Sequence, residues 1–351
     1  MPRQEMLGVP SRLCGLHAQL MSSAELTVWA RVEELEPTAV ADALWEERSL
    51  VKVWAMRGTL HLLPAAEFGL WQAALGTYGH YLKPSWLRAF GVTREELEKL
   101  LDAVARALDG QLLTRQELAA AVAELTGSPE LGEKVLGSWG PLLKPACFRG
   151  LLCFGPSAGQ NVRFTRPDRW LADVPPPLDP DQATLEVARR FLAAHGPATR
   201  DDYARWWAMT PAQAMRILKR LGEEVVPVHV DGSQAWMLAA HVDEAVRATP
   251  VRSVRLLPAF DQFVVTATRH ARHLLPGPFE NRIYRPQGWL SPVVLVDGRM
   301  DGVWRHERKG TRLAVTVEPF LDFPTKVRRG VEQEADRLAA FLGGGLELAW
   351  G

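Results

Sequence analysis

A polar pair near the start of the chain has the residue types and the spacing to act on a bound water molecule. His17 and Gln19 are two residues apart in the segment GLHAQL. An imidazole exchanges a proton near neutral pH, and an amide orients a water molecule through its oxygen. In a helix the two side chains would point about 200° apart, whereas in an extended segment they fall on the same side.

The residues that follow favour the extended conformation for this pair. The run Ser22-Ser23-Ala24-Glu25 has the S-x-x-E pattern of a capping box, and an amphipathic stretch follows it. A helix that begins near Ser22 leaves His17 and Gln19 just outside its N-terminus. We therefore predict that both side chains face one cavity. The alternative is that both bond backbone groups at the helix end.

An internal repeat links two later segments of the chain. Residues 49–64, SLVKVWAMRGTLHLLP, align with residues 141–156, PLLKPACFRGLLCFGP, and both end in a short apolar run typical of a strand. The identical pairs are Leu50/Leu142, Lys52/Lys144, Arg57/Arg149, Gly58/Gly150, Leu60/Leu152 and Pro64/Pro156. The repeat indicates that the chain contains copies of one structural unit.

The first copy of this repeat carries polar residues that the second copy lacks. In a strand, Arg57, Thr59 and His61 would share one face. Leu151 and Cys153 stand at the positions of Thr59 and His61 in the second copy, so the scaffold alone does not require polar residues there. We predict that Arg57, Thr59 and His61 form a functional face. A strand that is merely solvated at this point is the alternative.

The scaffold that must position these residues is clearest in residues 181–245. The helices predicted there span residues 183–194, 199–207 and 212–221. Two short strands, residues 225–230 and 234–238, flank Asp231-Gly232, a dipeptide typical of tight hairpin turns. Three helices followed by a two-stranded wing is the order of a winged helix-turn-helix.

The same order recurs earlier in the chain. Residues 91–173 contain three predicted helices and two strands, and residues 1–90 fit the pattern less closely. The helices of residues 91–173 are predicted at 95–108, 114–125 and 130–136, and the strands at 151–154 and 161–165. We therefore predict an α+β fold with three tandem winged helices, over residues 1–90, 91–173 and 181–245. VPPPLDP, residues 174–180, reads as a stiff linker.

From residue 251 onward the pattern changes to strands. They are predicted at residues 255–257, 263–267, 293–296, 301–306 and 313–317, and an amphipathic helix is predicted at 327–342. Asp297-Gly298 and Lys309-Gly310 mark turns between the last three strands. We predict a small C-terminal β domain with a closing helix over residues 251–351.

Several basic residues on this scaffold are candidates for gripping phosphates. Arg305, Arg308 and Lys309 surround the predicted turn near residue 310, and a solvated hairpin tip is the alternative reading. The repeat adds Lys52, Lys144 and Arg149 to Arg57 as predicted nucleic-acid contacts.

Composition excludes several other classes of protein. The 351 residues are 47% hydrophobic and 23% charged, with a net charge of zero, as in an ordinary globular chain. Cys14, Cys147 and Cys153 fit neither a disulfide framework nor a paired zinc motif, so we expect reduced, packed thiols. Motifs for nucleotide cofactors and zinc hydrolases are missing, and no apolar run is long enough to span a membrane. We therefore predict a cytoplasmic protein with no metal and no cofactor.

The chain resembles the AlkZ/YcaQ-like winged-helix DNA glycosylases over nearly its whole length. The segments that carry this resemblance are GLHAQ, WAMRGTLHLLP, RPQGWLSPVVLVDGRMDGVWRHERKG and VTVEPF. The resemblance implies three tandem winged helices and a β domain that form a curved channel for duplex DNA. It also implies hydrolysis of the N-glycosidic bond of alkylated bases and, in some members, the unhooking of interstrand crosslinks.

The resemblance implies that His17 and Gln19 are the catalytic residues. The family has a Gln-x-Gln or Gln-x-Asp motif where this chain has His17-Ala18-Gln19, so the chain departs from the family at the first position. An alkylated, cationic base is a good leaving group, so Gln19 would orient a water molecule and neutral His17 would accept its proton. Because no lysine is needed, we expect a monofunctional, metal-independent enzyme.

The expected partner is duplex DNA with alkylated bases or crosslinks, on the nucleoid when the protein is bound. Two alternatives stay open at this point. Winged helices also occur in DNA-binding regulators without catalysis and in scaffolds for other proteins.

Overall fold

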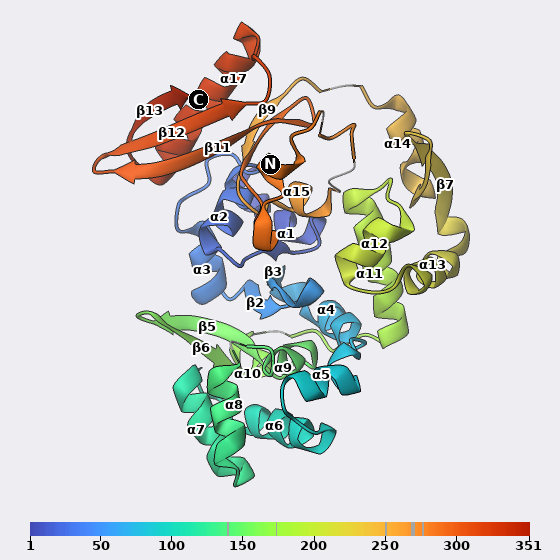
Figure 1. Cartoon of the computed structure of the whole chain (residues 1–351), viewed down its shortest axis with the longest axis vertical. Helices are drawn as coiled ribbons and strands as arrows, with labels where there is room; N and C mark the ends of the chain where they lie inside the picture. Colours follow the sequence, from blue (N-terminus) through green and yellow to red (C-terminus); the bar gives the residue numbers. More distant parts are fainter. Residues whose placement is uncertain (139, 173, 250, 268–270, 276) are drawn as a thin grey trace. The chain divides into compact units, whose positions relative to one another are not determined.

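The computed structural model covers residues 1–351 and describes all of them except 139, 173, 250, 268–270 and 276 (Figure 1). The chain forms two compact units. Unit 1 comprises Met1–Val40, Leu192–Trp206 and Leu221–Gly351, and unit 2 comprises Ala41–Phe191 and Trp207–Arg220. Both units contain helices and strands, which confirms the mixed α and β composition predicted from the sequence.

The helices of unit 2 begin close to the predicted residues. They include α6 (Arg94–Ala107), α7 (Arg115–Thr126), α8 (Pro129–Gly137) and α9 (Lys144–Phe148). Thr93 and Thr114 each accept a hydrogen bond from the backbone of a glutamate three residues later, and that glutamate accepts one in return. Such capping boxes satisfy two backbone donors at the start of α6 and of α7. α6 packs against α7 and α9.

An antiparallel sheet joins these helices in unit 2, with the order β3-β2-β5-β6-β4. Its strands are β2 (Leu50–Trp54), β3 (Leu60–Pro64), β4 (Leu113–Thr114), β5 (Cys153–Ala158) and β6 (Asn161–Thr165). The ring of Trp54 packs on those of Phe154 and Phe164, so strands from both copies of the repeat share one core. Further elements of unit 2 are α4 (Phe68–Leu75), α5 (Pro84–Ala89), α10 (Pro167–Trp170) and α13 (Pro211–Arg220).

A mixed sheet forms the C-terminal part of unit 1, with the order β13-β12-β11-β10-β9 (Figure 1). Its strands are β9 (Val254–Leu257), β10 (Val293–Val296), β11 (Arg299–Lys309), β12 (Arg312–Pro319) and β13 (Gly345–Trp350). β12 and β13 run parallel, because α17 (Thr325–Leu342) crosses between them and packs on β9, β12 and β13.

The remaining elements of unit 1 are short. They include α1 (Gly8–Arg12), β1 (Leu16–His17), α2 (Met21–Trp29), β7 (Val225–Val230), β8 (Ser233–Leu238), α14 (Val242–Arg247), α15 (Gln262–Thr266) and α16 (Glu280–Ile283). Three helices contain residues at or across the boundary between the units: α3 (Ala39–Trp45), α11 (Pro180–His195) and α12 (Arg200–Trp207).

Two hairpins are confirmed where Asp-Gly predicted a turn. β7 and β8 pair across Asp231 and Gly232, whose φ angles are 50° and 77°. β10 and β11 pair across Asp297 and Gly298, with φ angles of 51° and 83°. Positive φ at both central residues is what a two-residue type I′ turn needs.

The structure corrects three sequence-based predictions. Residues 263–267, predicted as a strand, lie mostly in helix α15, because the Asp261 carboxylate accepts a hydrogen bond from Phe263 N at 2.9 Å and caps the turn. Strand β13 was not predicted. Helix α2 begins at Met21 with Leu20 as its N-cap and no side-chain cap, so Ser22 does not open a capping box.

A buried ion pair connects the N-terminal part of unit 1 to the start of α15. Arg31 Nη1 and Nη2 lie 2.7 and 2.8 Å from the two carboxylate oxygens of Asp261. The Asp261 side chain is 0% exposed, while that of Arg31 is 23% exposed. A fully buried carboxylate is tolerated only with such partners, so this pair fixes the two segments together.

Loss of this pair should destabilise unit 1 strongly. Asp261→Ala leaves the Arg31 guanidinium without its carboxylate in a largely buried place, and we expect a loss of about 3–5 kcal/mol in the free energy of unfolding. Urea denaturation followed by circular dichroism measures it. The matched control, Asp243→Ala, removes an ion pair whose side chains are 85% and 78% exposed and should cost less than about 0.5 kcal/mol. Equal losses in both variants would contradict the role of Asp261.

A buried histidine should make the stability of unit 1 fall in acid. Burial, with the charge of Arg31, lowers the pKa of His195 from 6.5 to about 4, although a hydrogen bond to the backbone of Leu13 and the charge of Asp261 oppose this. Between these pH values the unfolded chain binds a proton that the folded chain does not. Stability is therefore complete above pH 6.5 and is lost as the pH falls toward 4.

His195→Gln should flatten this dependence whatever its effect at neutral pH. Urea denaturation between pH 7 and pH 4 should show a loss on the order of 2–3 kcal/mol from this group in the wild type. The control His229→Gln, at an exposed position of β7, should keep the wild-type slope. An unchanged slope in His195→Gln would show that another group controls the acid transition.

Candidate active site and nucleic-acid interface

His17 lies in an extended segment, as predicted, and its ring is held by an aromatic neighbour. It is the second residue of β1 and is 7% exposed. Its imidazole stacks on the ring of Phe260, with centroids 4.9 Å apart and planes 11° from parallel. The turn that leads into β1 has positive φ at Cys14 and Gly15, 58° and 91°. This stack fixes the plane in which the two ring nitrogens lie.

The segment that carries Phe260 is tied to the segment that carries His17. Gln262 Nε2 donates a hydrogen bond to Gly15 O at 2.6 Å. Asp261 pairs with Arg31, and Phe260 itself has a φ of +57°, a backbone conformation that a bulky residue rarely adopts. The residues that follow Phe260 are therefore tied to Gly15 and Arg31, so the segment that carries Phe260 is held against the segment that carries His17.

Gln19 differs from His17 in its exposure. Gln19 lies in a bend and is exposed, whereas Ala18 between them is 0% exposed. The amide of Gln19 is thus open to a ligand, and the His17 ring lies beneath the surface. The prediction that the two side chains face one cavity stays a prediction.

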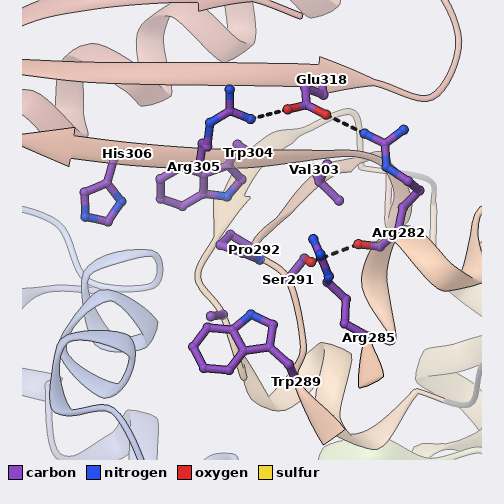
Figure 2. Close-up of a pocket in the computed structure, with 11 residues that line it drawn as sticks. Arg282, Arg285, Trp289, Ser291, Pro292, Val303, Trp304, Arg305, His306 and Glu318 are labelled. Carbon is purple, nitrogen blue, oxygen red and sulfur yellow. Dashed lines mark hydrogen bonds and ion pairs between the residues drawn. The ribbon is translucent and has the colours of Figure 1, made fainter. Parts of the chain in front are cut away.

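A cavity of about 370 Å³ opens beside Phe260 in unit 1 (Figure 2). Its walls include Ala259, Trp289 and Trp304. The rings of Trp289 and Phe260 form a T-shaped pair, with centroids 5.1 Å apart and planes at 77°. The rings of His17, Phe260 and Trp289 therefore form a continuous row. This row connects the predicted catalytic segment to the cavity.

The cavity carries an excess of positive charge. The described residues that line it include three arginines, Arg282, Arg285 and Arg305, but one carboxylate, that of Glu318. Arg282 and Arg305 both pair with Glu318 (Figure 2). Burial lowers the pKa of His306, so this histidine is neutral at neutral pH and adds no charge. The cavity suits an anionic group such as a phosphate.

The structure corrects the predicted strand face of Arg57, Thr59 and His61. Strand β3 begins only at Leu60, and Arg57 lies in a 3-10 turn with a φ of +59°. Thr59 Oγ1 donates to Met56 O at 3.0 Å, and His61 Nδ1 lies 3.0 Å from Thr59 O. His61 is 0% exposed, whereas Arg57 and Thr59 are half-buried. These three residues belong to unit 2, so a surface shared with His17 stays a prediction.

The identical lysines of the repeat occupy different secondary structure. Lys52 lies in β2, with Nζ 5.6 Å from the centroid of the Phe154 ring, and Lys144 is the first residue of α9. Lys144 covers Gly58, where a Cβ would lie 3.3 Å from Lys144 Cδ. Burial lowers the pKa of Lys144. The two glycines of the repeat, Gly58 and Gly150, both have positive φ, 66° and 70°.

Arg149 makes an ion pair and a further hydrogen bond within unit 2. Its two terminal nitrogens lie 2.6 and 2.7 Å from the Glu98 carboxylate, and its Nε donates to Tyr81 Oη at 3.2 Å. A bidentate pair of this kind uses the donors that would bind a phosphate. The guanidinium is already held on three sides, which argues against the predicted DNA contact, but that contact stays a prediction.

The basic hairpin at the C-terminal sheet forms as predicted. β11 and β12 pair from Gly302 to Lys309, and Gly310 in the turn has a φ of 60°. Arg308 donates to Leu342 O at 3.0 Å, and Lys309 Nζ lies 3.8 Å from Glu307. Arg305, Arg308 and Lys309 are all exposed, so they can reach a ligand.

Sequence reasoning missed Phe260, Arg285 and Trp289. The last two lie in RPQGW, part of a segment that carried the resemblance, but no periodicity assigned them a role. In the described part of the chain no cluster of His, Cys, Asp or Glu has the arrangement of a metal site. None of the described helices has the length and apolar character that crossing a membrane requires.

Comparison with known proteins identifies the family. Residues 11–341 match the family described as DNA glycosylase AlkZ-like. The chain belongs to this family. A relative from Streptomyces sahachiroi, an interstrand DNA cross-link repair glycosylase, is 37% identical over 339 residues, which are 95% of this chain and 90% of the relative. The solved structure of Streptomyces sahachiroi DNA glycosylase AlkZ is 35% identical, with a TM-score of 0.89, and the match covers 99% of this chain and 94% of that chain.

This match confirms the family and the enzyme class predicted from the motifs. The protein is a DNA glycosylase. The sequence-based alternatives of a regulator without catalysis and of a protein scaffold lose their support, because the match extends over nearly the whole chain and includes His17-Ala18-Gln19.

Arg149 should act on stability and not on DNA affinity. Hydrogen bonding to Arg149 lowers the pKa of Glu98, so this pair stabilises the fold above the ordinary carboxyl pKa and the contribution is lost as the pH falls through the lowered pKa. We expect Arg149→Ala to cost about 1 kcal/mol at pH 7, after allowance for partial exposure. Denaturation of Arg149→Ala, Glu98→Gln and the double variant measures the coupling.

The same variant tests the predicted contact of Arg149 with DNA. The dependence of duplex affinity on salt should be the same in Arg149→Ala as in the wild type, because no phosphate contact is removed. A less negative slope would restore Arg149 to the DNA-binding residues.

Proposed function

We propose that this glycosylase hydrolyses the N-glycosidic bond of N-alkylated purines in duplex DNA and also unhooks interstrand crosslinks. The observation that carries the proposal is the His17-Ala18-Gln19 segment, with an exposed Gln19 and with His17 held on Phe260 beside a positively charged cavity. The name of the Streptomyces sahachiroi relative supports crosslinks as substrates. The excess positive charge of the cavity supports the proposal that the DNA backbone lies close to this segment.

The reaction needs little from the protein besides position and a proton acceptor. Alkylation makes the purine cationic, and its departure neutralises that charge as the bond between C1′ and the base nitrogen breaks. A water molecule oriented by the Gln19 amide forms the new bond to C1′, and neutral His17 accepts the proton that this water loses. The products are a free base and an abasic site, and no strand is cut.

We propose three winged helices, over residues 1–90, 91–173 and 181–245, before a C-terminal β domain over residues 251–351. The order of helices and hairpins along the chain supports this, as do the capping of α7 by Thr114 and of α12 by Thr199. The C-terminal sheet with its closing helix supports a separate last segment.

The proposed DNA contacts are the predicted basic and polar residues that the structure leaves accessible. They are Lys52, Arg57, Thr59, Lys144, Arg305, Arg308 and Lys309. We leave out Arg149, which Glu98 holds, and His61, which has no exposed surface. A DNA-bound enzyme of this kind would work in the cytoplasm, on the nucleoid.

Substitution in the motif should abolish base release and preserve DNA binding. We expect His17→Ala and Gln19→Ala each to lower single-turnover release of N7-methylguanine by about 10²–10⁴-fold, with duplex affinity within a few fold of wild type. Alkaline cleavage of the abasic product measures release, and a crosslinked duplex tests unhooking. Chelators should have no effect. Release by both variants at the wild-type rate would contradict the proposal.

The role of His17 as a proton acceptor predicts a pH dependence. Activity should fall as the pH drops and His17 becomes protonated, because the cation accepts no proton and opposes positive charge on the sugar. His17→Gln should retain some activity with a flatter profile. Because His195 destabilises unit 1 in the same pH range, the folded fraction must be measured at each pH. An unchanged profile in His17→Gln would remove His17 from the proton transfer.

A further inference from the structure

An exposed loop over residues 285–289, RPQGW, stands at the rim of the cavity in unit 1. The loop is closed by a hydrogen bond from Arg285 N to Trp289 O at 2.8 Å and by a β-bridge between Tyr284 and Leu290. Gln287 at its tip has a φ of +59°, which is strained for a residue with a side chain. The loop therefore presents its two end residues in a fixed arrangement.

Trp289 exposes a large aromatic surface at one end of this loop. Trp289 is 46% exposed, a large fraction for an aromatic side chain. The indole packs against the Phe260 ring in a T-shaped arrangement, with ring centroids 5.1 Å apart, so Phe260 supports it on one side. An exposed, supported indole is suited to stacking on a nucleobase. Through Phe260 it lies one ring away from His17.

Arg285 places a positive charge at the other end of the loop. Arg282 and Arg305 both pair with one carboxylate, that of Glu318. In the described part of the chain, Arg285 has no carboxylate oxygen within 4.0 Å. Its guanidinium points toward the cavity beside Ser291 in Figure 2. Of the three arginines of the cavity, it is the one that does not pair with Glu318.

We propose that Trp289 and Arg285 clamp one nucleotide next to the lesion. The indole stacks on the base of this nucleotide, and the guanidinium binds its phosphate. This inference rests on the function proposed above. The neighbouring nucleotide, and not the lesion, is the occupant because the excess positive charge of the cavity would repel a cationic alkylated base.

The clamp would position the strand for the motif. Trp289 and His17 both contact the Phe260 ring, so a nucleotide held by Trp289 is held at a fixed offset from His17. Trp289 and Arg285 are thus positioning residues, and the water and C1′ are acted on by Gln19 and His17. The base of any sequence has a face to stack, so the clamp accepts any neighbour.

Binding measurements test the stacking half of the clamp. We expect Trp289→Ala to weaken the affinity of an undamaged duplex and of a duplex with 2′-fluoro-N7-methylguanine by at least about fivefold, the lower end of one base stack. Trp289→Phe should keep most of the affinity. The control Leu321→Ala removes another exposed apolar side chain, 71% exposed, and should have no effect. Weakening of the damaged duplex alone would show that Trp289 reads the lesion and would overturn the assignment.

Salt dependence tests the phosphate half. In Arg285→Ala the slope of log affinity against log salt should become less negative by about 0.9, the value for one phosphate contact. Arg285→Lys should restore the slope, since charge sets it. Arg252→Ala, which removes an exposed arginine outside the cavity, is the control and should keep the wild-type slope. A wild-type slope in Arg285→Ala would overturn the phosphate contact.

A kinetic measurement separates this inference from the function on which it rests. If the wild type releases no base from any lesion, the proposed function fails, while the binding results still decide whether the clamp holds a nucleotide. If the wild type releases the base and Trp289→Ala releases it at the same rate under saturating single-turnover conditions, the positioning role fails alone. The expected result is a slower rate at saturation, with Trp289→Phe restoring most of it.

Discussion

The geometry of the candidate site depends on the ion pair between Arg31 and Asp261. Asp261 is fully buried and makes two kinds of contact, because it pairs with Arg31 and caps α15, while its neighbour Gln262 bonds to Gly15. A buried carboxylate has few alternative arrangements, because any state that separates it from its partner leaves an uncompensated charge. The pair therefore acts less as a source of stability than as a constraint on the register of two segments. Phe260 lies inside that constraint, and His17 takes its ring plane from Phe260.

In unit 1, the positively charged groups are suited to the DNA backbone, and the neutral groups of the motif are suited to the lesion. The cavity concentrates three arginines around one carboxylate, while the adjacent motif offers an amide and an imidazole. Phosphates are anionic and the alkylated base is cationic, so one electrostatic environment cannot favour both. In the proposed mechanism, a neutral pair acts at the sugar while the arginines lie further along the row of rings, which avoids the repulsion that a cationic catalytic group would cause.

Local signals predicted the local structure, and they failed where distant residues decide it. The Asp-Gly turns and the threonine caps act over two to four residues, so the hairpins and helices near them were predicted correctly. The strand expected at residues 263–267 is a helix because Asp261 caps it, and Asp261 is placed by a partner 230 residues away. β13 forms because α17 returns the chain beside β12, which no period in its sequence reveals. The row of His17, Phe260 and Trp289 is equally non-local. We assigned Arg57 to a strand because the residue type does not reveal the positive φ angle that Arg57 adopts in its turn.

The histidine at the first motif position is coupled to the packing as well as to the chemistry. The family motif has glutamine at this position, whereas this chain places an imidazole nearly parallel to the Phe260 ring. The lone pair that would accept a proton lies in the ring plane, so a water molecule must approach along that plane and not from the face that Phe260 covers. An amide in the same place would lose much of the ring stack and would be free to rotate. In the proposed mechanism, His17 is therefore a proton acceptor whose direction is fixed by Phe260, and that direction depends on the ion pair that holds Phe260.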